Sequence, residues 1–123
     1  MDAEYLAIEK STFAPALRLL TTVISTNQRE FVTVDAGLKT LYRDGAAPRV
    51  FLPENSGLIY DWYGDEYGKI SHKEPDKLPA IGDVLELIVS HCDPTINLFD
   101  KYFITHGDQV VDIWNIDLRG CSQ

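Results

Sequence analysis

The amino-acid sequence predicts an all-β domain, mainly antiparallel, in the form of a small barrel or sandwich that could include one short helix. Two observations favour this class: short runs rich in β-branched and aromatic residues recur along the chain, and glycines stand at the turns between them. No internal repeat or Gly/Ser linker interrupts the pattern, so we expect residues 1–123 to form a single domain. The six strand candidates span residues 29–35, 58–64, 68–73, 84–90, 101–107 and 109–116.

The first half of the chain contains one clear strand candidate between two less regular segments. Residues 15–26 are ambiguous, because ALRLL favours a helix and TTVIS favours a strand; we interpret the segment as a strand. Residues 29–35 (REFVTVD) are followed by Ala36 and Gly37, where the glycine permits a turn. Residues 43–57 hold two prolines and two glycines without periodicity, so we predict a surface loop, of a length that often serves a site or a partner.

The second half of the chain predicts two hairpins. The candidates at 58–64 and 68–73 are joined by a short connection with a glycine on each side, which is typical of a hairpin. The last two candidates meet at Gly107 and Asp108 and should form the second hairpin. Between the hairpins, residues 74–83 are a predicted turn that leads into an apolar strand.

Length, charge and cysteine content exclude several classes of protein. The hydrophobic fraction of 45% is that of a globular protein, and no apolar run approaches the roughly 20 residues that span a bilayer. The net charge of −8 would repel a phosphate backbone, so we expect neither a membrane nor a nucleic acid as partner. The first residues lack the features of a signal peptide, which predicts a cytoplasmic protein whose Cys92 and Cys121 are reduced thiols.

The candidate site, His91 and Asp93, follows the strand predicted at 84–90. If the chain stays extended through Asp93, as Pro94 favours, the two side chains share one face at a Cα spacing of about 7 Å, and Cys92 points to the other face. Two ligands would leave most of the coordination sphere of a divalent ion open, and a carboxylate favours hard ions such as Mn²⁺ or Mg²⁺. From spacing alone, a hydrogen-bonded cap at the strand end is the simpler interpretation.

Five segments that together cover nearly the whole chain carry a family resemblance: ALRLLTTVIST (16–26), VTVDAGLKTL (32–41), GDEYG (64–68), HCDPTINLFDKY (91–102) and DIWNIDLRG (112–120). With them, the chain resembles the D-serine dehydratase-like domain that closes D-threonine aldolases and eukaryotic-type D-serine dehydratases. In that family the His and the residue two positions later bind the metal, and the second residue is Asp in the aldolase branch and Cys in the dehydratase branch. The resemblance therefore implies that His91 and Asp93 bind a divalent metal, Mn²⁺ first, with Zn²⁺ or Mg²⁺ as alternatives.

The resemblance also implies an activity and partners. It implies a lyase that cleaves D-3-hydroxy amino acids to glycine and an aldehyde, with pyridoxal phosphate on a lysine of a preceding (β/α)₈ barrel. A barrel needs roughly 250 residues, so we expect it to be missing from this chain, which alone should be inactive and should hold no catalytic or cofactor-binding residue. The implied partners are that barrel domain, in the same polypeptide or another subunit, a D-amino acid substrate and a second copy in a homodimer. Alternatives are a D-serine dehydratase domain and a stand-alone β-domain that acts only in binding.

Several further positions bear on the site. Tyr67 stands where members of the family that the chain resembles usually show a histidine, which leaves the substrate preference open. His72 could substitute for that histidine, although an exposed hairpin residue is the simpler interpretation. We interpret His106 as structural, Cys92 as a small buried hydrophobic residue, and Arg119 as either a structural ion pair or a substrate clamp.

Overall fold

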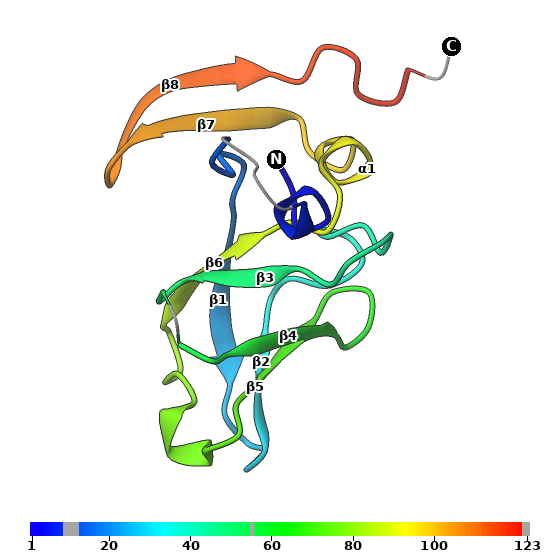
Figure 1. The fold of residues 1–123 in the computed structure, drawn as a ribbon. Helices are drawn as coiled ribbons and strands as arrows, with labels where there is room; N and C mark the ends of the chain where they lie inside the picture. The colour runs from blue at the N-terminus through cyan, green and yellow to red at the C-terminus, as the bar shows by residue number, and fades with distance from the viewer. Residues whose placement is uncertain (9–12, 55, 122–123) are drawn as a thin grey trace.

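Eight strands and one short α-helix form the regular structure of the chain within the residues that the structure describes. The computed structural model describes residues 1–8, 13–54 and 56–121 (Figure 1). Two single turns of 3₁₀ helix, Tyr5–Ala7 and Pro75–Lys77, complete the elements, and no described helix is long and apolar enough to cross a membrane. In chain order, the strands and the helix are β1 (Leu19–Ser25), β2 (Phe31–Val34), β3 (Arg49–Leu52), β4 (Ile59–Trp62), β5 (Gly68–Ser71), β6 (Val84–Ile88), α1 (Cys92–Ile96), β7 (Lys101–His106) and β8 (Gln109–Asn115).

Strands β1 to β6 close into an antiparallel barrel in the order β1-β2-β5-β4-β3-β6, with β6 paired back to β1 (Figure 1). Neighbouring strands meet in register through apolar residues: Val32 of β2 and Tyr60 of β4 both lie opposite Ile70 of β5 between them. The described part of the seam between β3 and β4 has one paired position, Arg49 opposite Ile59. Closure gives the sheet an interior of its own, so the barrel forms a core without a second sheet.

The barrel interior is filled by side chains that alternate along the strands. On β6, Leu85 and Leu87 are buried and Glu86 between them is half-buried, which is the period of two of a strand with one face inside. Tyr60 is among the largest fully buried side chains, and its hydroxyl donates a hydrogen bond to the carbonyl oxygen of Ala36 at 2.7 Å. Burial raises the pKa of Tyr60, with a further contribution from the nearby Asp61 carboxylate, so the phenol remains a donor.

The predicted all-β class is confirmed, and each of the six strand candidates contains a strand of the structure. Residues 15–26 also contain a strand, β1. The prediction of a loop throughout residues 43–57 is wrong, because Arg49–Leu52 form β3, which pairs with β6 on one side and β4 on the other. This strand has four residues and lies between Pro48 and Pro53, so its local composition is that of a loop; barrel closure supplies the hydrogen-bond partners.

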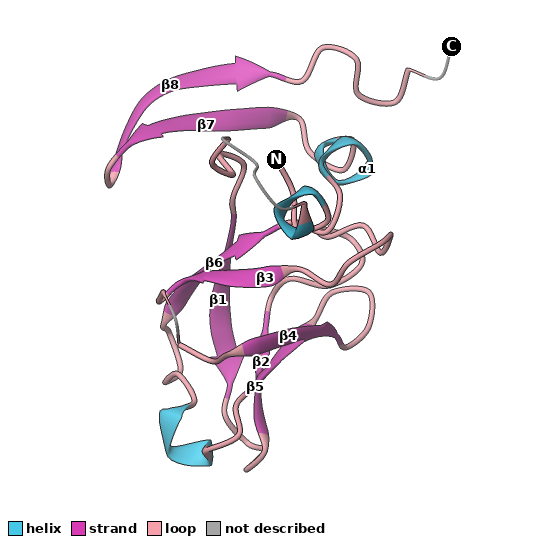
Figure 2. Ribbon diagram, in the orientation of Figure 1, coloured by secondary structure: helices cyan, strands magenta, loops and turns pink. Residues whose placement is uncertain are grey.

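Strands β7 and β8 form a separate two-stranded sheet that lies above the barrel in the view of Figure 2. Tyr102 lies opposite Trp114, and Phe103 lies opposite Ile113. After β8 the chain returns to the start of the hairpin, where the backbone N–H of Ile116 donates to the carbonyl oxygen of Asp100 at 2.9 Å. The short helix α1 connects this hairpin to the barrel, so the candidate site lies between the two sheets in the chain.

Candidate functional site

The backbone changes from strand to helix at His91. After β6, Val89 and Ser90 remain buried, His91 is still extended with φ −143° and ψ 129°, and α1 begins at the next residue, Cys92. The predicted extended chain through Asp93 is therefore wrong, and the spacing derived from strand geometry does not apply. The prediction failed because it took Pro94 as a sign of extended chain. Pro94 lies in the first turn of α1, where the backbone N–H groups have no partner within the helix, so a proline there is compatible with a helix start.

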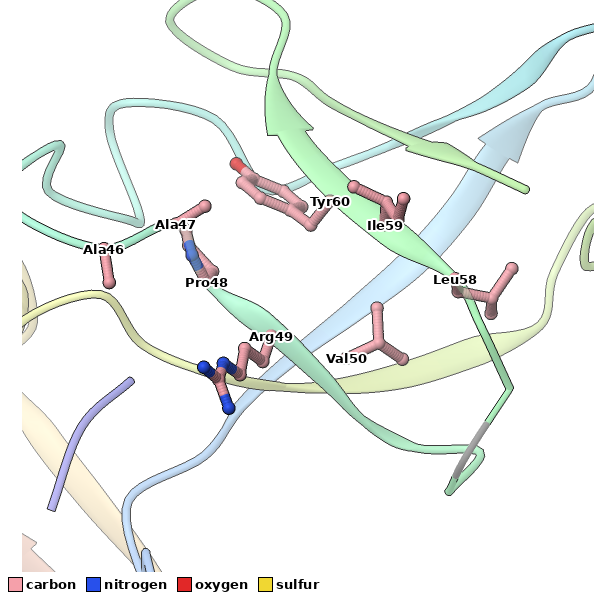
Figure 3. Close-up of a pocket in the computed structure, with 8 residues that line it drawn as sticks. All are labelled: Ala46, Ala47, Pro48, Arg49, Val50, Leu58, Ile59 and Tyr60. Carbon is pink, nitrogen blue, oxygen red and sulfur yellow. The ribbon is translucent and has the colours of Figure 1, made fainter. Parts of the chain in front are cut away.

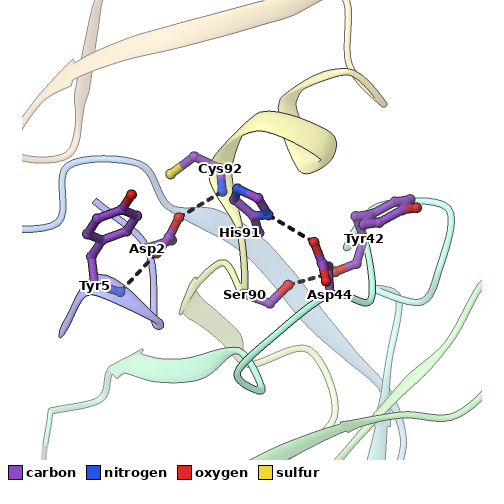
Figure 4. A network of polar contacts seen from close by, with 7 residues as sticks. All are labelled: Asp2, Tyr5, Tyr42, Asp44, Ser90, His91 and Cys92. Atoms are coloured by element: carbon purple, nitrogen blue, oxygen red, sulfur yellow. Dashed lines mark hydrogen bonds and ion pairs between the residues drawn. The ribbon is translucent and has the colours of Figure 1, made fainter. Parts of the chain in front are cut away.

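His91 is held by a residue from a distant part of the chain. Its Nδ1 lies 3.1 Å from Oδ2 of Asp44, which comes from the loop between β2 and β3 (Figure 4). The hydrogen bond with Asp44 raises the pKa of His91; partial burial works against this, and the charges of Asp2, Asp44 and Asp93 add to the increase. The imidazole is thus part of a locally acidic group of side chains, with its ring 39% exposed.

A second aspartate, Asp2, ties the N-terminal segment to the start of α1. Its side chain is buried, and its two oxygens accept backbone N–H groups, Oδ1 from Tyr5 and Oδ2 from Cys92, each at 3.1 Å (Figure 4). Burial acts to raise the pKa of Asp2, but the two N–H donors together with the charges of His91 and the N-terminus outweigh it, and the pKa is lowered. The backbone N–H of Ala3 also donates to the carbonyl oxygen of Val89 at 2.9 Å, so the N-terminal segment packs directly beside the site.

Asp93 and Cys92 lie next to each other at the beginning of α1 but in different surroundings. Asp93 is exposed, and its carboxylate forms no hydrogen bond or ion pair with any side chain of the described residues. Cys92 is half-buried and packs against the hydrophobic core, and burial raises the pKa of its thiol. The predicted packing of Cys92 as a small hydrophobic residue is confirmed, although its side chain is only partly and not fully buried. Burial also raises the pKa of Tyr102 on β7, with contributions from Cys92 and Asp93, so β7 lies near this end of α1.

The other residues singled out in the sequence have surroundings of their own. Tyr67 is exposed in the turn between β4 and β5, His72 contacts Glu74 after β5, and His106 is exposed at the end of β7. Arg119 forms an ion pair with Asp100 at 3.1 Å, as expected for a structural role. Within the described residues, no hydrogen bond or ion pair joins any of these four side chains to His91 or Asp93.

Sequence reasoning missed Asp2 and Asp44. Asp44 lies in the segment 43–57, whose length indicated a role at a site without indicating which residue would serve it. Asp2 gave no signal, because a carboxylate near the start of a chain is ordinarily exposed. Both positions depend on contacts across the fold, over sequence separations of 47 and 90 residues.

A groove of about 470 Å³ lies at the short seam between β3 and β4 (Figure 3). It is lined by residues 46–50 together with Leu58, Ile59 and Tyr60, and Arg49 is the charged residue among them. With one charged side chain and an otherwise mainly apolar lining, this groove does not provide the acid, base or ligand groups that the His91 group provides.

Known proteins of two related activities match the chain. A D-threonine aldolase from Arthrobacter sp. is 36% identical over 126 residues, which cover 100% of this chain and 33% of the aldolase. A 3-hydroxy-D-aspartate aldolase from Paracoccus denitrificans is 34% identical and is matched over 97% of this chain and 30% of its own length. The crystal structure of D-threonine aldolase from Filomicrobium marinum superposes with a TM-score of 0.89 at 31% identity, over 98% of this chain and 33% of that one. The chain spans about a third of the length of these relatives.

A family model agrees with these matches. The model described as "Putative serine dehydratase domain" matches residues 16–105. The matched residues include the six barrel strands, α1 with the adjacent His91, and most of β7. Because the match covers more than half of the sequence, this chain belongs to that family of serine dehydratase domains.

Proposed function

We propose that this chain is the metal-binding β-domain of a lyase that cleaves D-3-hydroxy amino acids to glycine and an aldehyde, with His91 and Asp93 as metal ligands. The observation that carries the proposal is the arrangement at the start of α1. There Asp44 engages Nδ1 of His91, and the carboxylate of Asp93 stands exposed two residues away. The matches to a D-threonine aldolase and a 3-hydroxy-D-aspartate aldolase, at 36% and 34% identity, support the assignment of the reaction.

The donor atoms fit a divalent ion as an open half-site. His91 offers Nε2, and Asp93 offers carboxylate oxygens, a combination that suits Mn²⁺ or Zn²⁺ and admits Mg²⁺. The described residues contain no group of three or more His, Cys, Asp or Glu side chains arranged to hold a metal. The remaining ligands would therefore be water, the substrate or groups outside the described residues, which is the open coordination that a catalytic metal requires.

When bound, the ion would polarise the hydroxyl group of the substrate as a Lewis acid. The fold supports the two donors in two ways. Ser90 is fully buried immediately before His91, so the backbone that carries the imidazole is anchored in the barrel. The carboxylates of Asp2, Asp44 and Asp93 surround His91 with negative charge, which favours a cation at this point.

Pyridoxal phosphate does not fit the described residues of this chain. A Schiff-base lysine needs a pocket that lowers its pKa, whereas the described lysines are exposed or pair with surface carboxylates: Lys39, Lys69, Lys73, Lys77 and Lys101. Lys10 lies outside the described residues. In this proposal, the cofactor belongs to the two thirds of the relatives that this chain does not span.

A D-serine dehydratase is the second candidate, because the matching family model is that of a serine dehydratase domain. The products separate the two reactions, since an aldolase yields glycine and an aldehyde whereas a dehydratase yields ammonia and a keto acid. We favour the aldolase because position 93 carries Asp, the residue that the aldolase branch shows in the family resemblance.

The metal assignment is tested by titrating Mn²⁺ into the chain and three variants in a calorimeter. We expect weak binding by the wild type, because two protein ligands give less affinity than a closed four-ligand site. His91→Ala and Asp93→Ala should each abolish binding, because either change leaves a single donor. Cys92→Ser should bind as the wild type does, because that side chain packs against the core.

Circular dichroism of the four proteins serves as the control for folding, and Asp93 is exposed, so its removal should leave the barrel intact. Loss of binding in Cys92→Ser together with retained binding in Asp93→Ala would contradict the assignment. Equal binding by His91→Ala and the wild type would contradict it as well.

A further inference from the structure

The contact between His91 and Asp44 restricts the protonation of the imidazole ring. A neutral imidazole has one N–H and one free lone pair, and an ionised carboxylate accepts hydrogen bonds without donating them. At 3.1 Å from Oδ2 of Asp44, Nδ1 of His91 must carry the proton. Nε2 then holds the lone pair, and it forms no hydrogen bond within the described residues.

We propose that Asp44 is a positioning residue of the site, which fixes His91 in the tautomer protonated on Nδ1 and presents Nε2 as the metal donor. The proposal rests on the function proposed above, in which His91 is a metal ligand. It goes beyond that function, because it assigns a role to a residue that lies 47 positions away and is not one of the proposed ligands. Ligating imidazoles are commonly held in this way by a carboxylate on the other ring nitrogen.

The backbone around Asp44 is anchored, which separates this contact from an ordinary surface ion pair. The hydroxyl of the fully buried Ser90 donates to the carbonyl oxygen of Tyr42 at 2.6 Å (Figure 4). Leu41 is completely buried, and its carbonyl oxygen accepts the indole N–H of Trp62 at 2.9 Å. The loop is therefore fixed to the barrel just before Asp44, as the chain of His91 is fixed at Ser90.

Two hydrogen bonds join the segment 90–91 to the segment 42–44. Ser90 forms a hydrogen bond with the backbone of Tyr42. The next residue, His91, forms one with the side chain of Asp44, which follows Tyr42 by two positions. Two other carboxylates act on His91. Asp2 has both oxygens engaged by backbone N–H groups, and Asp93 is itself a proposed metal ligand. Asp44 is thus the carboxylate positioned to orient the ring.

The test compares Asp44→Ala with the wild-type chain through two measurements. Long-range ¹H–¹⁵N correlation spectra of the metal-free proteins, recorded where His91 is neutral, report which ring nitrogen carries the proton. We expect Nδ1–H in the wild type and a shift toward Nε2–H in the variant. Calorimetric titration with Mn²⁺ should show binding weakened roughly 10- to 100-fold, the usual effect of removing such a partner.

Asp108→Ala is the matched control, because it removes the same charge from the exposed turn of the β7–β8 hairpin, far from His91 in the chain. It should leave the tautomer and the Mn²⁺ affinity unchanged. If Asp44→Ala does not fold, Asp44→Asn replaces it, because an amide N–H can donate to Nδ1 and so admits the opposite tautomer.

The proposal is overturned if wild-type His91 is protonated on Nε2, or if the Asp44 variant binds Mn²⁺ as tightly as the wild type does. Failure of the proposed function has a different signature, since His91→Ala would then leave Mn²⁺ binding unchanged. In that case the metal-free spectra still report whether Asp44 sets the tautomer, so the two failures are distinguishable.

Discussion

Asp2 shows how one residue can join a terminal segment to a site. Its carboxylate is 3% exposed and accepts one backbone N–H from Tyr5 and one from Cys92. Hydrogen bonds to an ionised acceptor are stronger than those to a neutral one, and a buried acceptor that loses its donors is costly. The charge of Asp2 therefore stabilises both the 3₁₀ turn Tyr5–Ala7 and the start of α1.

Asp2→Asn should lower the free energy of unfolding by about 1–2 kcal/mol at neutral pH, because a neutral amide replaces an ionised acceptor of two hydrogen bonds. The folded pKa of Asp2 lies below its unfolded value of about 3.9. The stabilisation is therefore complete above the unfolded pKa and is lost as pH falls through the folded pKa. Urea unfolding of both proteins should show a difference that shrinks below about pH 4.

Asp108→Asn is the control for this experiment, since Asp108 is exposed and its side chain forms no hydrogen bond within the described residues. Its stability should follow that of the wild type at each pH. A difference between Asp2→Asn and the wild type that stays constant down to acid pH would show that the charge of Asp2 contributes nothing.

At the scale of elements, the sequence was informative where local composition determines the structure. The strands β2, β4, β5, β6, β7 and β8 coincide with runs of β-branched and aromatic residues, and the hairpin between β4 and β5 has the glycines that its turn requires. β3 was missed because its pairing with β6 and β4 comes from barrel closure. Its four residues lie between two prolines, and their local sequence does not indicate a strand.

The candidate site was predictable in its position but not in its geometry. His91 and Asp93 follow a strand, as predicted, but Pro94 lies within a helix start and not within an extended chain. The contacts of Asp44 and Asp2 with this segment depend on how loops meet across the barrel, and single-sequence patterns contain no information on such distant contacts. The metal assignment of His91 and Asp93 stays a prediction.

Gly68 on β5 gives a test of barrel packing. It is buried, and an added Cβ would collide with the ring of Tyr60 and with the carbonyl oxygen of Ala36, the two groups joined by the tyrosine hydrogen bond. Gly68→Ala should destabilise the fold by about 1–3 kcal/mol, because neither the packed ring nor the backbone can move aside freely. Chemical denaturation followed by tyrosine and tryptophan fluorescence measures the change.

Ser71→Ala is the control on the same strand, because Ser71 is half-buried and its hydroxyl forms no hydrogen bond within the described residues. It should change the stability by less than about 0.5 kcal/mol. Equal stabilities of Gly68→Ala and Ser71→Ala would mean that the Tyr60 cluster is not tightly packed.

At the scale of the whole molecule, the β7–β8 hairpin presents an apolar face that the described residues do not cover. Tyr102 is half-buried and lies near α1, so the side chains that alternate with it, Phe103 and the paired Ile113, point away from the barrel. They are 65% and 51% exposed, and Val111 near them is 60% exposed. Soluble monomers seldom expose contiguous apolar patches of this kind, and such patches usually mark contact surfaces.

The chain by itself should therefore self-associate through this face, because burying it in a second copy removes apolar surface from water. Sedimentation velocity over a range of concentrations should show a rising average mass for the wild type. The double variant Phe103→Thr/Ile113→Thr should remain closer to the monomer, since threonine preserves strand propensity while removing most of the apolar area. The matched control is Leu20→Thr/Ile81→Thr, which changes two residues of similar exposure, 65% and 67%, outside the hairpin. That control should associate as the wild type does. A wild type that stays monomeric at high concentration would rule out the hairpin as the contact surface. Equal association of the two double variants would rule it out as well.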